Sequence, residues 1–350
     1  MFNEVDNAFM SRALALAARG RYTARPNPMV GAVLVKAGHS IGEGYHAACG
    51  QAHAEVMALQ QAEVQPRGAV CYVTLEPCAH HGRTPPCVEA LIKAGVARVV
   101  VAMLDPNPLV AGKGVEALRA HGIEVDVGLL ADDAMALNAG YVLRHTRHRP
   151  LVMAKIAMSL DGRTAMASGE SQWITSPASR ERVQELRAES GAILTSINTV
   201  LADNPRLTVR SESVFRACPQ GTAFHQPKRV LLDRQGRASK TAAIFSEEAP
   251  TWHVTGQQDL AAILDELAVS EVNQVLIEAG PQLVGAFLAG GLVDELLLFY
   301  APKLLGHEGK PMAIFPQIET LDQHLPLNVK SIEQVGPDIY IRASVHYGSK

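Results

Sequence analysis

The chain has 350 residues and a formal net charge of −3, and 47% of its residues are hydrophobic. This composition excludes a disordered or fibrous protein, and the length predicts about two domains. The small negative charge gives no electrostatic reason for nucleic acid to be the partner. No apolar run reaches the roughly 18 residues that a membrane span needs, and we expect no signal peptide at the N-terminus. The sequence therefore predicts a globular protein that binds small molecules, with neither a nucleic-acid nor a membrane partner.

Five cysteines are scattered along the chain, namely Cys49, Cys71, Cys78, Cys87 and Cys218. An odd number without a secretion signal predicts a reducing, cytoplasmic location. In that compartment, clustered cysteine and histidine more often bind a metal than form a disulfide.

Apolar periodicity in the first half predicts helices that alternate with strands. The predicted helices are 4–19, 52–63, 86–94, 114–121 and 132–144. The predicted strands are 30–35, 70–75, 98–104 and 123–127. This order is typical of a layered α/β domain with a mostly parallel sheet. The basic, proline-terminated stretch 145–150 is the predicted linker, so the expected domains are 1–147 and 148–350.

A second α/β pattern follows the linker. Its clearest helix is 177–189, with Ser176 as N-cap and Pro177 at the first helical position. A helix is also predicted at 282–289, and strands at 151–158, 230–232, 251–254 and 274–278. The stretch 295–300 is apolar enough to indicate an interface, and we expect a homo-oligomer, either a dimer or a tetramer.

The most informative pattern joins His53, Cys78 and Cys87, which lie at the ends of predicted elements. One imidazole and two thiols can hold Zn²⁺ by three ligands and leave the fourth tetrahedral position to water. Glu55 lies two residues past the histidine, where it can move the protons of that water without being a ligand. Zinc nucleobase deaminases use this ligand set with a non-ligand glutamate, although their usual signature separates the cysteines by two residues rather than eight. The predicted chemistry is hydrolysis of an exocyclic C–NH₂ bond.

Other interpretations of these residues are a helix histidine with two buried thiols, or a structural zinc. A structural zinc needs a fourth protein ligand, and the chain offers Cys49, His46, His80 and His81 for that role. It would make the domain a non-catalytic, zinc-stabilised binding module. Because a carboxylate beside a structural zinc has no function, Glu55 favours the catalytic site.

Motifs around these residues resemble the N-terminal half of the bifunctional riboflavin-biosynthesis deaminase/reductase family. They are 27–31 (NPMVG), 44–46 (GYH), 53–55 (HAE), 74–87 (TLEPCAHHGRTPPC) and 105–108 (DPNP). In that family the two cysteines are separated as they are here. The resemblance implies a cytidine-deaminase-like three-layer α/β/α domain that deaminates a diaminopyrimidine carrying a phosphoribosylamino group.

The resemblance also assigns residues in this first site. It implies that Glu55 is catalytic, and that zinc is held by His53, Cys78 and Cys87. It implies that the substrate is bound by Asn27, His46, His80, Arg83, Asp105 and Asn107. His80 and Arg83 also carry groups that pair with phosphate oxygens, whereas 105–108 has the composition of an ordinary turn.

The run 112–117 (GKGVEA) fits the dinucleotide fingerprint G-x-G-x-x-A. The preceding predicted strand ends near residue 104, so the tight strand-to-helix turn that gives those glycines their purpose is missing. We interpret the run as a flexible entry to the next helix.

The second half resembles the reductase of the same family, at 158–165 (MSLDGRTA), 171–177 (SQWITSP), 186–187 (LR) and 199–210 (TVLADNPRLTVR). This resemblance implies a dihydrofolate-reductase-like fold and NADPH as the cofactor. It implies cofactor contacts by Ala157, Trp173, Thr199, Asp203, Gly280, Pro281, Gln282, Leu283, Val284, Gly285 and Ala286. It implies substrate contacts by Ser171, Arg187, Leu207, Arg210 and Glu278.

Several of these residues have a physical rationale of their own. At 278–286 an apolar strand leads through glycine into a helix, whose first N–H groups suit a phosphate, although such a glycine is often only a turn. The guanidinium groups of Arg187 and Arg210 match phosphate oxygens, and Lys155 is a charge in an apolar strand, where we expect it beside the sugar. Arg234 stands where the family often has serine after Asp233, which puts a cofactor contact there in question.

The sequence thus predicts two consecutive reactions in one chain, a zinc-dependent deamination and an NADPH-dependent reduction of the ribosyl group to a ribityl chain. A nucleoside or tRNA deaminase with an unrelated C-terminal domain is the alternative enzyme. It would need a basic face near the zinc, which the composition does not favour.

Overall fold

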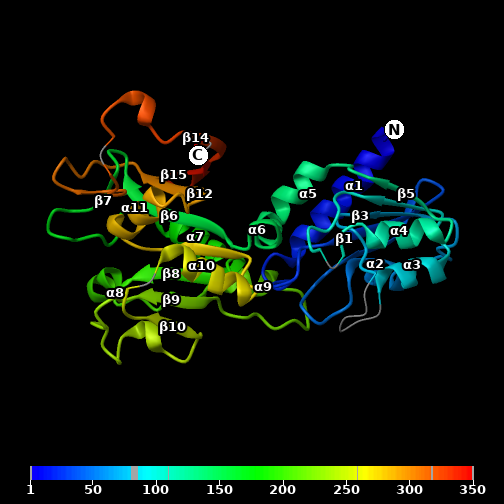
Figure 1. The fold of residues 1–350 in the computed structure, drawn as a ribbon, viewed down its shortest axis with the longest axis horizontal. Coiled ribbons are helices and arrows are strands. Elements are labelled where there is room, and N and C mark those ends of the chain that lie inside the picture. The colour runs from blue at the N-terminus through cyan, green and yellow to red at the C-terminus, as the bar shows by residue number, and fades with distance from the viewer. Residues whose placement is uncertain (1, 80–85, 109, 258, 317, 349–350) are drawn as a thin grey trace. The chain divides into compact units, whose positions relative to one another are not determined.

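The computed structural model describes residues 2–79, 86–108, 110–257, 259–316 and 318–348 (Figure 1). The chain forms two compact units. One consists of Met1–His148 with Phe215–His225, and the other of Arg149–Val214 with Gln226–Lys350. None of the helices within the described ranges is long and apolar enough to cross a membrane.

The first unit contains a five-stranded sheet in the order β2-β1-β3-β4-β5. Its strands are β1 (Gly31–Lys36), β2 (His39–Tyr45), β3 (Val70–Val73), β4 (Arg98–Val101) and β5 (Glu124–Val127). Strands β3, β4 and β5 are parallel to one another, whereas β1 is antiparallel to both of its neighbours. The expectation of a mostly parallel sheet is therefore only half right in this unit.

Helices cover both faces of this sheet, because successive side chains of a strand point to opposite sides. Ala32 and Leu34 pack with helices α2 (Ala54–Gln60), α3 (Cys87–Ala94) and α4 (Lys113–Ala120). Val33 and Val35 pack with helix α1 (Glu4–Ala17) on the other face. The result is a three-layer α/β/α unit.

Strand β2 was not predicted from the sequence, since its residues HSIGEGY lack an apolar alternation. It follows β1 through Ala37 and Gly38, which both have positive φ, as a tight hairpin requires. Its glycines have a packing role, because a Cβ on Gly44 would lie 2.3 Å from the carbonyl oxygen of Ala54. Helix α2 therefore lies directly against the backbone of β2.

The predicted helix 132–144 is two helices, α5 (Ala131–Leu137) and α6 (Ala139–Arg147). The break lies at Asn138, a buried residue whose side chain bonds a neighbouring loop instead of solvent. A polar side chain of this kind competes with helical hydrogen bonding, which explains why the helix does not continue through it.

The second unit contains an eight-stranded sheet in the order β10-β9-β8-β11-β6-β12-β15-β14. Its strands are β6 (Leu151–Ser159), β8 (Ala192–Ser196), β9 (Lys228–Leu232), β10 (Thr251–Val254), β11 (Gln274–Ile277), β12 (Glu295–Ala301), β14 (Leu327–Val335) and β15 (Asp338–Val345). All pairings from β10 to β12 are parallel, and the last two are antiparallel. A short pair, β7 (Arg163–Ala165) and β13 (Lys310–Pro311), lies beside it.

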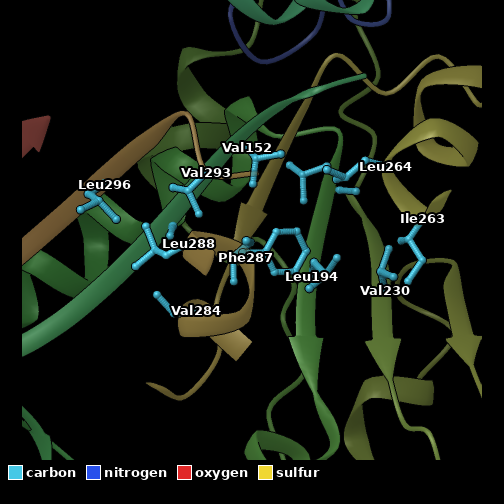
Figure 2. Packing of buried hydrophobic residues seen from close by; sticks show 14 of the residues in the cluster. Val152, Leu194, Val230, Ile263, Leu264, Val284, Phe287, Leu288, Val293 and Leu296 are labelled. Carbon is cyan, nitrogen blue, oxygen red and sulfur yellow. The ribbon is translucent and has the colours of Figure 1, made fainter. Parts of the chain in front are cut away.

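The helices of this unit are α7 (Pro177–Glu189), α8 (Ile197–Asp203), α10 (Leu260–Val269) and α11 (Pro281–Ala289), while α9 (Glu212–Ala217) begins in this unit and ends in the segment that belongs to the first unit. Figure 2 shows Phe287 and Leu288 of α11 and Leu264 of α10 packed on one face of the sheet. On the other face, Val200 of α8 packs on Leu231. Helix α7 begins where the sequence predicts, because the Ser176 side chain accepts a hydrogen bond from the Ser179 N–H.

The stretch 295–300 lies in the interior rather than at an interface. It forms β12, which is hydrogen-bonded to β6 on one side and to β15 on the other, and most of its residues are buried. Its apolar character is therefore explained by the core of the unit itself, and the interface expected there is a wrong inference.

Candidate functional site

The three predicted zinc ligands lie together in the first unit. His53 is the N-cap of α2, Cys87 is the first residue of α3, and Cys78 follows the end of β3. His53 Nδ1 lies 3.2 Å from Cys87 Sγ and 3.6 Å from Cys78 Sγ, and all three ligand atoms lie within 4.8 Å of one another. The close contact between α2 and β2 fixes the histidine in this arrangement.

This donor set fits a tetrahedral zinc ion. With Zn–S of about 2.3 Å and Zn–N of about 2.0 Å, tetrahedral ligands lie about 3.5–3.8 Å apart. The two nitrogen–sulfur separations, 3.2 and 3.6 Å, are close to this spacing. The Cys87 thiol donates to Cys78 and lowers the pKa of Cys78 to about 4, whereas the same contact and burial raise the pKa of Cys87, which would lose its proton on binding the metal. A thiolate is the form that binds metal.

Glu55 lies in the first turn of α2 and is buried. Burial, with a further contribution from the negative charge of Cys78, raises the pKa of Glu55 to about 7. A carboxyl group with such a pKa can both accept and release a proton near neutral pH, as general acid/base catalysis requires.

Asn27 and His46 form the next part of the site. The amide Nδ2 of Asn27 lies 3.0 Å from His46 Nε2, and His46 Nδ1 lies 3.2 Å from the carbonyl oxygen of Ala52. Burial lowers the pKa of His46, so its ring is neutral and can donate to Ala52 while accepting from Asn27. The His46 ring packs edge-on against His53 at 5.3 Å between centroids, which places both residues beside the ligand cluster.

Two residues that the sequence did not single out hold the surrounding loops. Asn138 binds both the N–H and the carbonyl oxygen of Met29, at 2.8 and 2.9 Å. Three residues further on, the Tyr141 hydroxyl donates to Asp105 at 3.0 Å. Asn138 is the N-cap of α6 and Tyr141 lies in its first turn, so the start of this helix joins the loop after Asn27 to the loop at Asp105. The sequence gives only one hint of this role, which is an asparagine at an interior position of the predicted helix 132–144.

The loop 105–108 is a turn as well as a candidate binding loop. The N–H of Asn107 donates to the Asp105 carboxylate at 2.8 Å, which is the local bond of an Asx turn. His80 and Arg83, the remaining predicted substrate residues of this unit, lie outside the described residues.

The backbone N–H groups of Gly112 and Gly114 bind a carboxylate of the protein itself rather than a nucleotide. Buried Glu76 accepts hydrogen bonds from the N–H groups of Asp105, Gly112, Gly114 and Val115, at 2.9–3.2 Å. Gly112 is the N-cap of α4 with φ +84°. The expected flexible entry is therefore wrong: the start of this helix is fixed by a negative charge, which a helix N-terminus favours.

We expect Glu76→Ala to lower the free energy of unfolding of the first unit by about 3 kcal/mol, because it leaves four N–H groups without their acceptor. Thermal unfolding followed by circular dichroism measures the change. Glu116→Ala, at an exposed position on the same helix, is the control and should change stability by less than about 0.5 kcal/mol. Equal stabilities of the two variants would contradict the role of Glu76.

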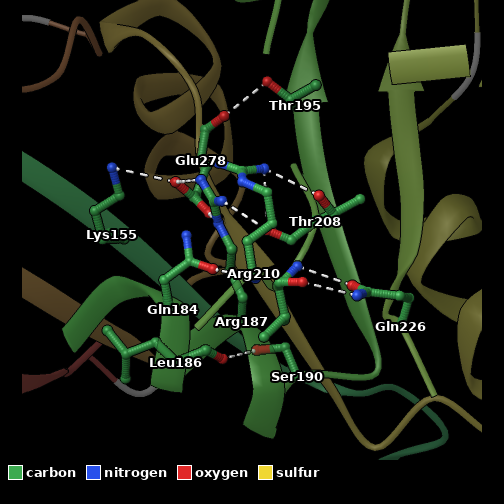
Figure 3. A network of polar contacts seen from close by, with 11 residues as sticks. Lys155, Gln184, Leu186, Arg187, Ser190, Thr195, Thr208, Arg210, Gln226 and Glu278 are labelled. Atoms are coloured by element: carbon green, nitrogen blue, oxygen red, sulfur yellow. Dashed lines mark hydrogen bonds and ion pairs between the residues drawn. The ribbon is translucent and has the colours of Figure 1, made fainter. Parts of the chain in front are cut away.

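In the second unit, Glu278 lies at the centre of a charged network (Figure 3). Arg187 Nε lies 2.6 Å from Glu278 Oε1, and Lys155 Nζ lies 3.3 Å from Oε2. Thr195 donates its hydroxyl to the Glu278 carbonyl oxygen at 2.7 Å. Although burial alone would raise it, the two cations lower the pKa of Glu278 to about 2. The carboxylate is therefore charged at neutral pH.

A third cation, Arg210, lies next to this network. Arg187 Nη1 also donates to the Thr208 carbonyl oxygen, and Arg210 Nη1 donates to the Thr208 hydroxyl at 2.9 Å. Burial, then the positive charge of Arg187, lowers the pKa of Arg210. Leu207, just before Thr208, has φ +51°, a conformation that costs an L-residue about 1 kcal/mol or more. The chain here is held in shape by its surroundings, as is common at functional sites.

These residues line a cleft of about 1590 Å³. A single small ligand needs roughly 300–1000 Å³, so this cleft has room for a cofactor and a substrate together. The predicted residues that line it are Lys155, Ala157, Ser171, Trp173, Arg187, Thr199, Asp203, Leu207, Arg210, Glu278, Gly280, Pro281, Gln282, Leu283 and Ala286. The N-terminus of α11 thus faces the cleft, as the strand–glycine–helix pattern predicts.

Val284 and Gly285 do not line this cleft. Val284 is fully buried in the core (Figure 2), and a Cβ on Gly285 would lie 1.7 Å from the Ile314 carbonyl oxygen. Their place in the family motif is explained by packing. Arg234 does line the cleft, with its Nη2 2.9 Å from Gln257 Oε1.

Comparison with known proteins identifies the family of each half of the chain. The family described as cytidine and deoxycytidylate deaminase zinc-binding region matches residues 3–103, and the RibD C-terminal domain matches residues 150–341. The chain is 47% identical to the riboflavin biosynthesis protein RibD of Escherichia coli (strain K12), over 95% of this chain and 98% of that protein.

Solved structures give the same result. A RibD structure from Acinetobacter baumannii has a TM-score of 0.90 and 45% identity, and covers 98% of this chain and 99% of that one. A Thermotoga maritima structure has a TM-score of 0.88 and 34% identity over 98% and 99%. It is described as a diaminohydroxyphosphoribosylaminopyrimidine deaminase/5-amino-6-(5-phosphoribosylamino)uracil reductase.

The fold and the sites therefore define an enzyme of two parts, a cytidine-deaminase-like zinc hydrolase joined to a dihydrofolate-reductase-like, NADPH-dependent reductase. The resemblance found in the motifs is confirmed, and an unrelated C-terminal domain is excluded. The chain belongs to the RibD family of riboflavin biosynthesis proteins.

Proposed function

We propose that residues 1–147 carry the deaminase activity and residues 148–350 the reductase activity, which act one after the other. The first reaction releases ammonia from the diaminopyrimidine that carries a phosphoribosylamino group, giving 5-amino-6-(5-phosphoribosylamino)uracil. The second reduces the ribosyl group to the ribityl chain of 5-amino-6-(5-phosphoribitylamino)uracil. The observation that carries the proposal is the cluster of His53, Cys78 and Cys87 beside buried Glu55.

In the first reaction, a zinc ion held by His53, Cys78 and Cys87 would make a water acidic enough to act as the nucleophile at neutral pH. The Glu55 carboxylate would move the two protons of the attacking water one after the other, the first to the ring nitrogen and the second to the amino group, which leaves as ammonia. Asn27 and neutral His46 orient the pyrimidine, because their mutual hydrogen bond fixes the Asn27 amide. His80, Arg83, Asp105 and Asn107 complete the proposed substrate site.

In the second reaction NADPH supplies a hydride. The proposed cofactor site is the N-terminal turn of α11 with Ala157, Trp173, Thr199 and Asp203. Arg187 and Arg210 are proposed to bind the substrate phosphate, because Glu278 neutralises only part of the positive charge that Lys155, Arg187 and Arg210 bring to the cleft. Lys155 lies beside the sugar, and Ser171 and Leu207 border it.

Metal analysis combined with two separate assays tests this proposal. Ammonia release from the diaminopyrimidine phosphate reports the first reaction, and NADPH oxidation with the deaminated intermediate reports the second. One zinc per chain and both activities are expected. Zinc with four protein ligands and no ammonia release would instead show a zinc-stabilised binding module.

Arg234 offers a test of cofactor choice. NADPH differs from NADH by one phosphate, which arginine commonly recognises. Arg234 has a neutral amide partner, Gln257, whereas Arg206 in the same cleft is paired with the Glu248 carboxylate at 3.0 Å. We expect Arg234→Ser to raise KM for NADPH about tenfold, a change of about 1.4 kcal/mol.

The steady-state kinetics of both nicotinamide cofactors measure this effect. The KM for NADH should not change in Arg234→Ser. Arg206→Ser is the matched control and should keep the wild-type preference, because its charge is already compensated. An unchanged NADPH preference in Arg234→Ser would remove Arg234 from the cofactor site.

We further propose that the protein works in the cytoplasm as a homo-oligomer, a dimer or a tetramer, with small molecules rather than nucleic acid or membrane as its partners. Support for self-association comes from β14, which ends its sheet in the described structure and exposes Val329 and Ile332. Light scattering of the purified protein tests the oligomeric state.

A further inference from the structure

Residues Phe215–His225, called here the returning segment, lie within the part of the chain that matches the RibD C-terminal domain. In the structure this segment nevertheless belongs to the compact unit formed by Met1–His148. Neither the sequence pattern nor the mechanism gives it a role. Its contacts show which part of the deaminase unit it serves.

The segment holds the side chain of Arg25. Arg25 Nη2 donates to the carbonyl oxygen of His225 at 2.5 Å. The guanidinium group also lies over the ring of Phe224, at 5.8 Å from its centroid, and Phe224 packs edge-on against Phe215 at 5.4 Å. A planar cation is thus bound both by a carbonyl oxygen and by an aromatic face, which together fix its orientation.

The segment makes a second hydrogen bond to the same unit. Gln51 Nε2 donates to the carbonyl oxygen of Gly221 at 3.5 Å. That carbonyl is presented by a tight turn, in which the Thr222 N–H donates to the Pro219 carbonyl oxygen and Gly221 has φ +75°. A positive φ at the third position of such a turn is typical of glycine. The acceptor is therefore part of a locally ordered structure.

Both contacts lie next to the deaminase site along the chain. Arg25 is two residues before Asn27, and Gln51 is two residues before His53. Asn27 and His53 are in turn joined through His46, which bonds Asn27 at 3.0 Å and packs against His53 at 5.3 Å. The returning segment thus binds both of the loops that lead to Asn27 and His53.

We propose that the returning segment is a positioning element of the deaminase site, which keeps Asn27 in place for the substrate by holding Arg25. This inference rests on the proposed function of the first unit. It makes Arg25 and Phe224 positioning residues rather than catalytic ones, since they act through Asn27. It also means that a stretch of the reductase sequence contributes to the affinity of the deaminase for its substrate.

Kinetics of full-length variants test the proposal. We expect Arg25→Ala to raise KM for the diaminopyrimidine phosphate about tenfold, with a smaller change in kcat, because the affected residue binds substrate and does not move protons. Phe224→Ala should raise the same KM about threefold to fivefold, as loss of a cation–π contact implies. Arg25→Lys and Phe224→Tyr should recover part of the loss, because the first keeps a cation and the second keeps the aromatic ring.

Three further measurements separate positioning from general damage. Zinc content should stay at the wild-type value in every variant, and NADPH oxidation with supplied intermediate should not change. Arg12→Ala is the matched control, because Arg12 is another arginine of the unit and forms an ion pair with Glu43 at 2.7 Å. It should have wild-type KM values.

A wild-type KM for deamination in both Arg25→Ala and Phe224→Ala would overturn the proposal. So would a loss of zinc, or an equal loss of both activities, because either result would show a merely structural role. Absence of ammonia release from the wild-type protein is a different result, which would remove the proposed function on which the inference rests.

Discussion

Replacement of Glu55 by glutamine is expected to lower kcat for ammonia release by about 10²–10⁴-fold, the range that general acid/base catalysis contributes. Glutamine keeps the size and much of the hydrogen bonding of the side chain but cannot accept and return a proton. Since Glu55 is not one of the three clustered ligands, the variant should keep its zinc. Ammonia release and metal content, measured on the same sample, give the result.

Two controls sharpen this experiment. Cys87→Ser removes a ligand and should lose both zinc and ammonia release, so the two variants differ in metal content and not in activity. NADPH oxidation with the deaminated intermediate should remain at the wild-type rate in Glu55→Gln. A variant that still released ammonia at the wild-type rate would remove Glu55 from the reaction, and one that lost zinc would make it a structural residue.

Replacement of Glu278 by glutamine should have the largest effect on the second unit. The carboxylate lies between Arg187 and Lys155 and is buried, so its loss leaves two cations without their counter-charge. Removing one partner of a buried ion pair costs about 3 kcal/mol or more. The substrate phosphate site should weaken too, because glutamine can accept only one of the two hydrogen bonds that orient Arg187.

The pH dependence of this effect has a defined direction. The pKa of Glu278 is lowered from 4.5 to about 2 in the folded protein, so ionised Glu278 contributes stability that is complete above pH 4.5. This contribution, about 3 kcal/mol, is lost as pH falls from 4.5 towards 2. The difference in unfolding free energy between wild type and Glu278→Gln should therefore shrink over that range.

Tryptophan fluorescence during urea unfolding can follow this difference, because the chain has two tryptophans, Trp173 and Trp252, and both lie in the second unit. Comparison of two proteins at each pH removes effects that they share, such as protonation of the zinc ligands. Glu212→Gln, a change at an exposed glutamate of the same unit, serves as the control. A difference that stayed constant between pH 5 and pH 3 would contradict the assignment.

The sequence predicted that His53, Cys78 and Cys87 lie together, because these residues stand at the ends of clearly patterned elements. Cys78 follows a β-branched strand, and Cys87 starts a helix that the preceding prolines delimit. Strand β2 could not be predicted in this way. Its Gly44 is selected by contact with α2, a tertiary feature that leaves no periodic signal in the chain.

The polar interior was harder to predict than the apolar one. Glu76 looked like the end of a strand, yet it anchors the start of α4 through bonds from residues up to 39 positions away. Asn138 was placed inside a continuous helix, because helical periodicity does not reveal which polar side chain is turned inward. Such partners are distant in sequence, and only folding brings them together.

The second unit shows two further limits of prediction from sequence: elements that were missed, and motif residues that proved to lie in the core. Helix α10 and strands β8, β14 and β15 were not predicted. Helix α11 was predicted correctly, but its Val284 and Gly285 face the core and not the cleft. A family motif records every position that a site needs, including those that only allow the backbone to approach its neighbour. The sequence alone does not separate these two kinds of residue.

The membership of residues 215–225 in the first unit has a practical meaning for protein engineering. The two halves of the chain cannot be exchanged independently. A hybrid that joins this deaminase to the reductase of a relative would place a turn of different sequence against Arg25 and Gln51. Within the family, substitutions at Arg25 should accordingly be accompanied by substitutions at Phe224. A hybrid that keeps the native 215–225 loop should bind pyrimidine better than one that does not.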